Sequence, residues 1–202
     1  TLAAALIEQV NRIQSTGRGL VNLGGTITSS NSVDDATVPL GSAGLPFGIT
    51  VPGSFDVVVY DGSGTPTTTT INVTAATTLN SLAADLDAIP NFSASVNANL
   101  ELELGTSSPN TFTFGNDTSN ALTALGVNGL FTGRNASTIA VNTDILADPR
   151  LLSSSFDTDA QNTGDNSAAL AMAQPKAPAR TSTPVAIPST GITTRKGTAV
   201  TS

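Results

Sequence analysis

The sequence predicts a β-rich α+β protein with antiparallel sheets, hairpins and short covering helices, and with flanking helical segments at the start and near residue 170. The strongest observation is residues 54–115, where two β-branched stretches precede a leucine-patterned helix and three further short strands. Composition agrees, because Thr, Ser and Asn are frequent and favour strands and turns. Aromatic residues are only 4% of the 202 residues, so we expect a core of Ala, Val, Leu and Ile.

The chain is predicted to begin with a helix over residues 1–16. Its apolar residues recur on one helical face: Leu2, Leu6, Val10 and Ile13, with Ile7 beside them. Gly17 and Gly19 are expected to end this helix. Because only Thr1 could cap its start, we interpret residues 1–20 as the end of a longer helical stalk and the chain as an internal fragment.

Residues 21–53 are rich in Gly, Ser, Thr and Pro and are predicted to be a loop and β connector. Candidate strands within it are Thr26–Ser29 and Thr37–Leu40. The acidic pair Asp34-Asp35 could in principle do acid–base work or hold a cation. Adjacent side chains on a strand or loop point in different directions, so we predict a solvated turn there instead.

A hairpin is predicted next, with strands at Ser54–Tyr60 and Thr67–Thr74 joined by a turn at Asp61–Gly64. The turn partly matches an Asp-rich calcium loop. It lacks the spaced later carboxylates and the distal Glu of such a loop, so an ordinary turn is the better interpretation.

A helix capped by Thr77 or Thr78 and ended by Pro90 is predicted to follow the hairpin. Its core-facing residues are Leu79, Leu82, Leu86 and Ile89. Three more strands are predicted, at Phe92–Asn97, Leu100–Leu104 and Thr111–Gly115. The ββαββ order of the first five elements, which the strand at Thr111–Gly115 closes, predicts a layer in which the helix covers one face of an antiparallel sheet.

Two glutamates in the fourth of these strands have the separation that a glycosidase would use. Glu101 and Glu103 alternate with leucines and would lie roughly 7 Å apart on one face. Asp56 and Asp61 lie on or beside the same sheet. Few aromatic residues are present to stack a sugar ring, so we interpret the glutamates as the solvent-facing side of a strand.

Residues 116–133 complete a predicted ββαββα domain over residues 54–133. The cluster Asn116–Ser119 offers N-cap residues for a short helix that ends at Gly126. The core-facing residues of that helix are Ala121, Leu122 and Leu125. The turn after it presents Leu130 and Phe131, which we interpret as a packing anchor.

Residues 134–173 are predicted to return the chain to the helical stalk. A strand is expected at Thr138–Val141, and Asp148-Pro149 should open or break a short helix. A last helix begins near Ala168 with Asp165 or Asn166 as its cap. Residues 174–202 are a Pro/Thr-rich tail, predicted to be extended or a linker, because four prolines prevent a helix: Pro175, Pro178, Pro184 and Pro188.

Composition also excludes several kinds of chemistry. Cys and His are absent, which excludes disulfides, thiolate metal sites and the Ser-His-Asp and Cys-His types of catalysis. The formal net charge is −7 and every acid lies at or before Asp165, so the body should repel a phosphate backbone. No stretch is long and apolar enough for a membrane span. We predict no enzyme activity, no catalytic, cofactor-binding or metal-binding residues, no cofactor, and no nucleic-acid or membrane partner.

Four stretches resemble the flagellar hook-associated proteins of the FlgK type. Phe114–Asn142 is similar to the family's DTSN-L-LG-N-FFTG-A--I-VN pattern, and Glu8–Leu20 is similar to its E-VN-IH-TGYGLDG pattern. Ile71–Ile89 is similar to the IN motif of flagellins and hook-associated proteins. Gly164–Leu170 is similar to PGDNSNAL, which starts the family's C-terminal helix. The resemblance as a whole extends over about residues 2–20 and 54–173, with loops between these stretches. The resemblance fails after Gln174, where the family continues a long helix.

Two positions depart from the family pattern. Leu130-Phe131 stands where the family has two phenylalanines, which keeps the position apolar. Leu100 stands where a hairpin turn of the family has glycine. We expect either a looser turn at Leu100 or a left-handed Asn97 or Asn99 in its place.

The resemblance implies a secreted, extracellular and non-enzymatic structural subunit of the bacterial flagellum, located at the hook–filament junction with its middle domains facing outward. The implied partners are further copies in the full-length assembly, the hook protein and other hook-associated proteins. The fragment alone is expected to be monomeric, because the terminal polymerisation helices of the family are absent. An alternative is an extracellular β-rich adhesin or carbohydrate-binding module, since a Thr-, Ser- and Asn-rich acidic composition suits any bacterial surface domain.

Overall fold

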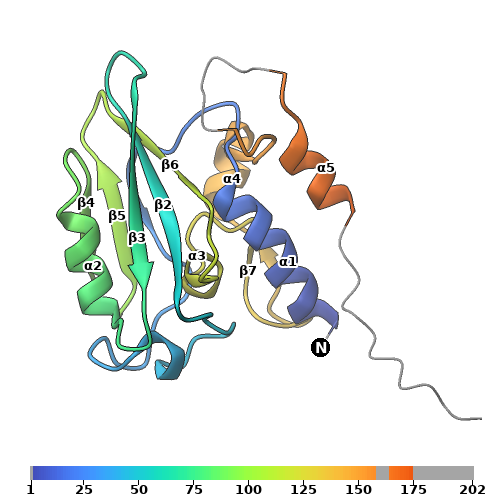
Figure 1. Cartoon of the computed structure of the whole chain (residues 1–202). Helices are drawn as coiled ribbons and strands as arrows, with labels where there is room; N and C mark the ends of the chain where they lie inside the picture. The colour runs from blue at the N-terminus through green and yellow to red at the C-terminus, as the bar shows by residue number, and fades with distance from the viewer. Residues whose placement is uncertain (1, 158–163, 175–202) are drawn as a thin grey trace, which may run out of the picture.

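Two three-stranded antiparallel sheets form the centre of the molecule (Figure 1). The computed structural model describes residues 2–157 and 164–174. One sheet has the order β3-β2-β6, from β2 (Gly53–Tyr60), β3 (Pro66–Val73) and β6 (Thr111–Gly115). The other has the order β1-β5-β4, from β1 (Gly25–Thr28), β4 (Ser93–Val96) and β5 (Leu102–Thr106). The predicted antiparallel α+β class is confirmed.

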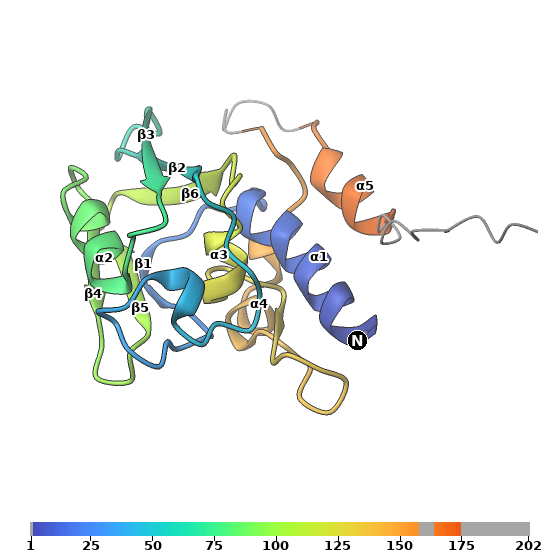
Figure 2. The same cartoon turned by 60° about the horizontal axis from the view of Figure 1, so that its bottom comes forward.

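Helices lie on both sides of these sheets (Figures 1 and 2). On one side, α2 (Leu79–Asp87) packs against β4. On the other, α1 (Leu2–Thr16) packs against α3 (Ala121–Leu125), β6 and α5 (Ser167–Ala173). The remaining elements are short: the 3₁₀ turns η1 (Leu40–Ser42) and η2 (Pro149–Leu151), the paired strands β7 (Phe131–Thr132) and β8 (Ala140–Val141), and α4 (Thr143–Ala147).

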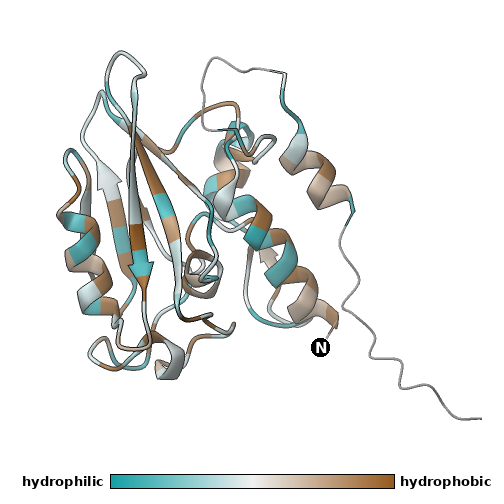
Figure 3. Ribbon diagram, viewed as in Figure 1, coloured by the Kyte–Doolittle hydropathy of each residue, from teal (hydrophilic) through white to brown (hydrophobic). Residues whose placement is uncertain are grey.

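Aromatic side chains occupy the middle of the core, whereas the composition predicts a core of Ala, Val, Leu and Ile. Phe112 lies edge-to-face against Phe92 and Phe114, with ring centroids 5.0 and 5.6 Å away. Phe114 in turn contacts Phe55 at 6.4 Å. The central strands carry many hydrophobic residues (Figure 3), and β2 is buried on both faces from Val57 to Tyr60. Few aromatic residues are present, but the fold gathers them at one place.

The predicted helix after the first hairpin is confirmed as α2, and its cap is a reciprocal one. The Ser81 backbone N–H donates to Thr78 Oγ1 at 3.1 Å, and the Thr78 N–H donates to Ser81 Oγ at 3.0 Å. The exchange satisfies two amide groups that a helix start leaves unpaired. The buried face contains Leu79, Leu82, Ala83 and Leu86, and the helix ends at Asp87.

The predicted single sheet beneath this helix is wrong, because the strands divide between two sheets. Thr26–Ser29 in the connector does form a strand, β1, which pairs with one edge of β5 while β4 pairs with the other. With both edges of β5 occupied, β6 has no place beside it and pairs with β2 instead. The other candidate strand, Thr37–Leu40, is not formed, and a 3₁₀ turn begins at Leu40.

The turn before β5 is neither a looser turn nor one built on a left-handed Asn97 or Asn99, which were the two arrangements expected. Leu100 itself takes the left-handed conformation, with a φ of 60°, and its N–H donates to Asn97 O at 3.1 Å. Asn97 Oδ1 accepts hydrogen bonds from the N–H groups of Asn99 and Glu101, which holds the turn closed. As a result, β5 starts at Leu102, two residues later than predicted.

Replacing Gly126 with alanine is expected to destabilise the fold by about 2 kcal/mol, measured as a change in the free energy of urea unfolding. Gly126 ends α3 with a φ of 73°, and an added Cβ would lie 2.1 Å from Ser30 Oγ. Gly64→Ala is the matched control, because Gly64 has a φ of 82° and nothing within 4 Å. It should show only the cost of the backbone conformation, about 1 kcal/mol. Equal losses in the two variants would contradict the proposed clash.

Candidate functional site: the junction of the first helix with the body

A buried polar stripe joins α1 to the rest of the molecule. Asn11, Gln14 and Ser15 are 2%, 0% and 0% exposed, although all three are polar. Buried polar side chains are stable only when their hydrogen bonds are made, so their partners define the junction.

Asn11 forms a two-way pair with the backbone of Phe131. Its Nδ2 donates to Phe131 O at 2.7 Å, and its Oδ1 accepts from the Phe131 N–H at 2.8 Å. The close approach depends on Gly129, where an added Cβ would lie 2.9 Å from Asn11 Nδ2. Phe131 packs against the buried cluster that contains Ile7 of α1 and Phe47, so its expected role as a packing anchor is confirmed.

Gln14 lies one helical turn after Asn11 and binds the return segment, the name used below for residues 134–157. Its Nε2 donates to Leu151 O at 3.1 Å, and its Oε1 accepts from the Ser153 N–H at 3.0 Å. Ser153 Oγ donates to the carbonyl oxygen of Gln14 at 2.8 Å. Beyond the helix end, the Arg18 N–H donates to Ser155 O at 2.7 Å. The return segment is therefore attached to α1 as a short extended stretch.

A third contact involves Glu8, at the other end of the stripe. Asn120 Nδ2 donates both to Glu8 Oε1 at 3.1 Å and to Gly48 O at 2.8 Å. Asn120 precedes α3 in a left-handed conformation, which directs its side chain toward α1. Its side-chain oxygen is one of two buried polar side-chain atoms without a hydrogen-bond partner in the described part of the chain.

Sequence reasoning missed this stripe, although one signal for it was present. Asn11, Gln14, Ser15 and Arg18 recur at the spacing of one helical face. The predicted apolar face is only partly buried: Ile7 and Val10 are covered, whereas Leu2 is 84% and Leu6 42% exposed. The start of α1 therefore carries an open apolar surface.

The helix α5 lies antiparallel to α1, so α1 starts and α5 ends on the same side of the molecule (Figures 1 and 2). Asp165 attaches α5 to the return segment. It accepts hydrogen bonds from Ser155 Oγ, Ser167 Oγ and the Ser167 N–H at 2.5, 2.7 and 3.1 Å. The prediction that Asp165 caps this helix is confirmed, whereas Asn166 makes no side-chain cap.

Acidification should release α5 through Asp165. The hydroxyls of Ser155 and Ser167 lower the pKa of Asp165 from 3.8 to about 2. A depressed pKa means that its contribution to stability is complete above about pH 4 and is lost as the pH falls toward 2. We expect the protection of the Ala168 and Ala169 amides, which donate to Ser154 O, to fall over that window when their exchange is compared with the intrinsic rate at each pH. Hydrogen exchange measured by NMR on the native chain and on Asp165→Asn tests this. An unchanged pH dependence in Asp165→Asn would contradict the assignment.

The acidic residues considered for chemistry occupy ordinary turns and strands. Asp35 accepts from the Thr37 hydroxyl and N–H, which lowers the pKa of Asp35. Asp61 accepts from the hydroxyl and N–H of Ser63 and from the Thr65 N–H, and these bonds lower the pKa of Asp61. Among the described residues, no three Asp or Glu side chains gather as they would around a metal ion.

Glu103 of β5 and Glu101, just before that strand, alternate with buried leucines as predicted, but both glutamates are half-buried and not fully solvent-facing. Glu101 accepts a hydrogen bond from Asn97 Nδ2 at 3.0 Å. Asp56, on β2, accepts from Asn116 Nδ2 at 2.7 Å and from Thr70 Oγ1 at 2.6 Å. The predicted N-cap cluster is also used: Asp117 Oδ2 accepts from the Leu122 N–H at 3.0 Å.

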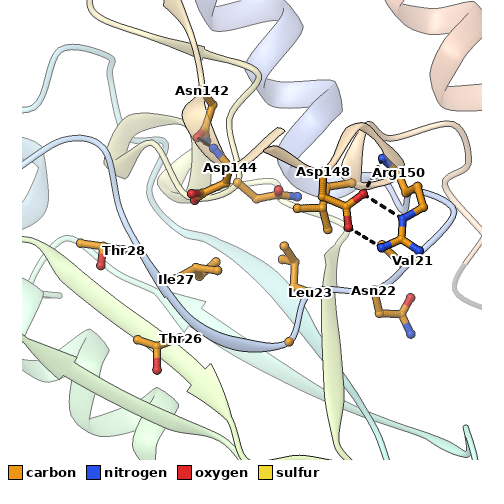
Figure 4. A pocket seen from close by; sticks show the side chains of 13 residues that line it. Val21, Asn22, Leu23, Thr26, Ile27, Thr28, Asn142, Asp144, Asp148 and Arg150 are labelled. Carbon is orange, nitrogen blue, oxygen red and sulfur yellow. Dashed lines mark hydrogen bonds and ion pairs between the residues drawn. The ribbon is translucent and has the colours of Figure 1, made fainter. Parts of the chain in front are cut away.

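A cleft of about 420 Å³ opens between β1 and the return segment (Figure 4). One wall is the stretch from Val21 to Thr28, and the other includes Asn142, Asp144 and the Asp148–Arg150 pair. That pair has a separation of 2.8 Å between Arg150 Nη2 and Asp148 Oδ2. The cleft is therefore bounded by a strand edge on one side and by charged side chains on the other.

Within the described ranges, none of the helices is both long and apolar enough to cross a bilayer. A scan of the sequence against models of known protein families and a comparison with curated proteins both find no match.

Proposed function

We propose that this chain is the outward-facing part of a flagellar hook-associated subunit at the hook–filament junction, with a structural role. The observation that carries the proposal is spatial. Three of the four stretches that resemble the family pack together at one junction: Glu8–Leu20 in α1, Phe114–Asn142 through β7, and Gly164–Leu170 in α5. Stretches far apart in the sequence, which resemble one family in that family's order, thus contribute to the same junction.

The positions of α1 and α5 and the leucines that they expose also support a structural role in an assembly. The antiparallel arrangement of α1 and α5 places both stalk helices on one side of the body, with the sheets extending away from them (Figure 1). Leu2, Leu6 and Leu170 are 84%, 42% and 52% exposed on these two helices. Apolar surface of this kind favours further helical packing, which an assembled subunit would supply. The body would then face outward, in a secreted extracellular protein that contacts the hook protein, other hook-associated proteins and further copies of itself.

Deletion of the gene provides the functional test. We expect the deletion strain to assemble hooks without filaments, seen by electron microscopy, and to recover filaments when the intact gene is returned. The adhesin alternative predicts the opposite pattern: normal filaments, with weaker binding of the cells to glycans or host surfaces. Normal filaments in the deletion strain would therefore exclude the proposed role.

Sedimentation of the isolated 202-residue chain tests a second consequence. If assembly depends on stalk helices longer than those described, the chain should sediment as a monomer at micromolar concentration. A stable oligomer would show that the body associates by itself.

A further inference from the structure

The outer edge of β1 is an unpaired strand edge that faces the cleft. In the described part of the chain, β1 pairs only with β5, on its other side. Just after β1, the Ser29 N–H donates to Leu102 O at 2.8 Å. Backbone groups of an antiparallel strand alternate in direction, so Ile27 turns its groups toward β5 while Thr26 and Thr28 turn theirs into the cleft.

Both ends of this edge are closed by the chain itself. At one end, the Leu20 N–H donates to Arg150 O at 2.8 Å, and at the other the Ser30 N–H donates to Gly126 O at 3.2 Å. The free edge between them is the part that lines the cleft. It can accommodate one short added strand, which would hydrogen-bond to the groups of Thr26 and Thr28.

The cleft also favours a cationic strand with some apolar character. Leu23 and Ile27 give its floor an apolar part (Figure 4). Asp144 and Asp148 face it from the other wall, and only Asp148 is paired with a cation, Arg150. Among the described residues, no hydrogen bond or ion pair is made by the Asp144 carboxylate.

One segment of this chain has the matching chemistry. All fifteen acids and four of the eight Lys and Arg residues lie in residues 1–174, a formal charge of −11, whereas residues 175–202 hold the other four bases, a formal charge of +4. Proline cannot donate to a strand ladder, and the last one is Pro188. After it comes Ile192–Lys196, with the sequence ITTRK, in which three β-branched residues precede two cations.

We propose that Ile192–Lys196 of the same chain seats in this cleft as an added strand on the edge of β1, with its cations toward Asp144. The eighteen residues from Gln174 to Ile192 can span about 60 Å, more than the width of about 40 Å expected of a body of this size. A tether of this length gives an effective concentration in the millimolar range, which favours the chain's own segment over that of another copy. This inference does not depend on the flagellar proposal.

Hydrogen exchange at β1 tests the seating in the full-length chain. The test variant is Thr194→Pro, which removes a ladder donor from the segment, and the matched control is Thr181→Pro, which adds a proline where prolines already occur. We expect the amides of Thr26 and Thr28 to exchange at least about tenfold faster in Thr194→Pro than in the native chain, and at the native rate in Thr181→Pro. Both positions lie outside the described residues, so neither substitution removes a contact described above.

Equal exchange at Thr26 and Thr28 in all three proteins would overturn the proposal. Protection that increases with protein concentration would also overturn it, because the strand would then come from a second copy. Asp144→Asn provides an independent measurement: it should reduce the protection of both amides, and to a smaller extent at high salt, where charge pairing is screened.

Discussion

Truncating Phe112 to alanine is expected to lower the free energy of unfolding by about 3–5 kcal/mol. The Phe112 side chain is fully buried and its ring contacts Phe92 and Phe114 edge-to-face. Removing it leaves a cavity at the place where the two sheets meet, and neither sheet can close that cavity alone. Urea unfolding should show a lower midpoint with an unchanged slope, since the surface exposed on unfolding is nearly the same.

Two further variants separate the causes of that loss. Phe156→Ala removes the same side chain from a position that is 42% exposed, and should cost less than about 1 kcal/mol. Phe112→Leu restores most of the volume without the aromatic pairs, so it should recover more than half of the lost stability. If Phe112→Leu were as unstable as Phe112→Ala, the aromatic contacts would matter more than the filled volume.

The sequence predicted the elements whose causes are local. The hairpin, the α2 cap at Thr78 and the left-handed end of α3 at Gly126 each depend on residues within a few positions of one another. The division into two sheets was not predictable in this way, because it depends on β1 taking the edge of β5 far along the chain. Leu100 shows the same limit, since nothing nearby indicates that a leucine will take the left-handed position.

The junction was missed for the same reason. Asn11 and Phe131 are separated by 120 positions, and Gln14 and Ser153 by 139. The apolar residues of the first helix dominated its interpretation, although its buried side is largely polar. A polar side chain on a helix is normally solvated, so only its long-range partners reveal that it is buried.

Replacing Asn11 with alanine is expected to cost about 2–3 kcal/mol in the free energy of unfolding. The loss is larger than that of two ordinary hydrogen bonds, because the N–H and carbonyl of Phe131 would remain within the junction without their partner. Asn80→Ala is the matched control: Asn80 is exposed on α2, and alanine favours the helix there. Thermal and urea unfolding of both variants should show a loss for Asn11→Ala and none for Asn80→Ala.

Asn11→Leu and Asn11→Asp test whether the two-way pair with Phe131 is the cause. Leucine restores apolar volume, but the groups left unpaired belong to the backbone, so no apolar side chain at position 11 can satisfy them. Aspartate still accepts from the Phe131 N–H, yet it cannot donate to the carbonyl and it places a charge in a buried position. Both variants should therefore be about as unstable as Asn11→Ala. If Asn11→Leu had native stability, the volume that the side chain at position 11 fills would stabilise the junction. The attachment of α1 to the body would then not depend on the hydrogen bonds between Asn11 and Phe131.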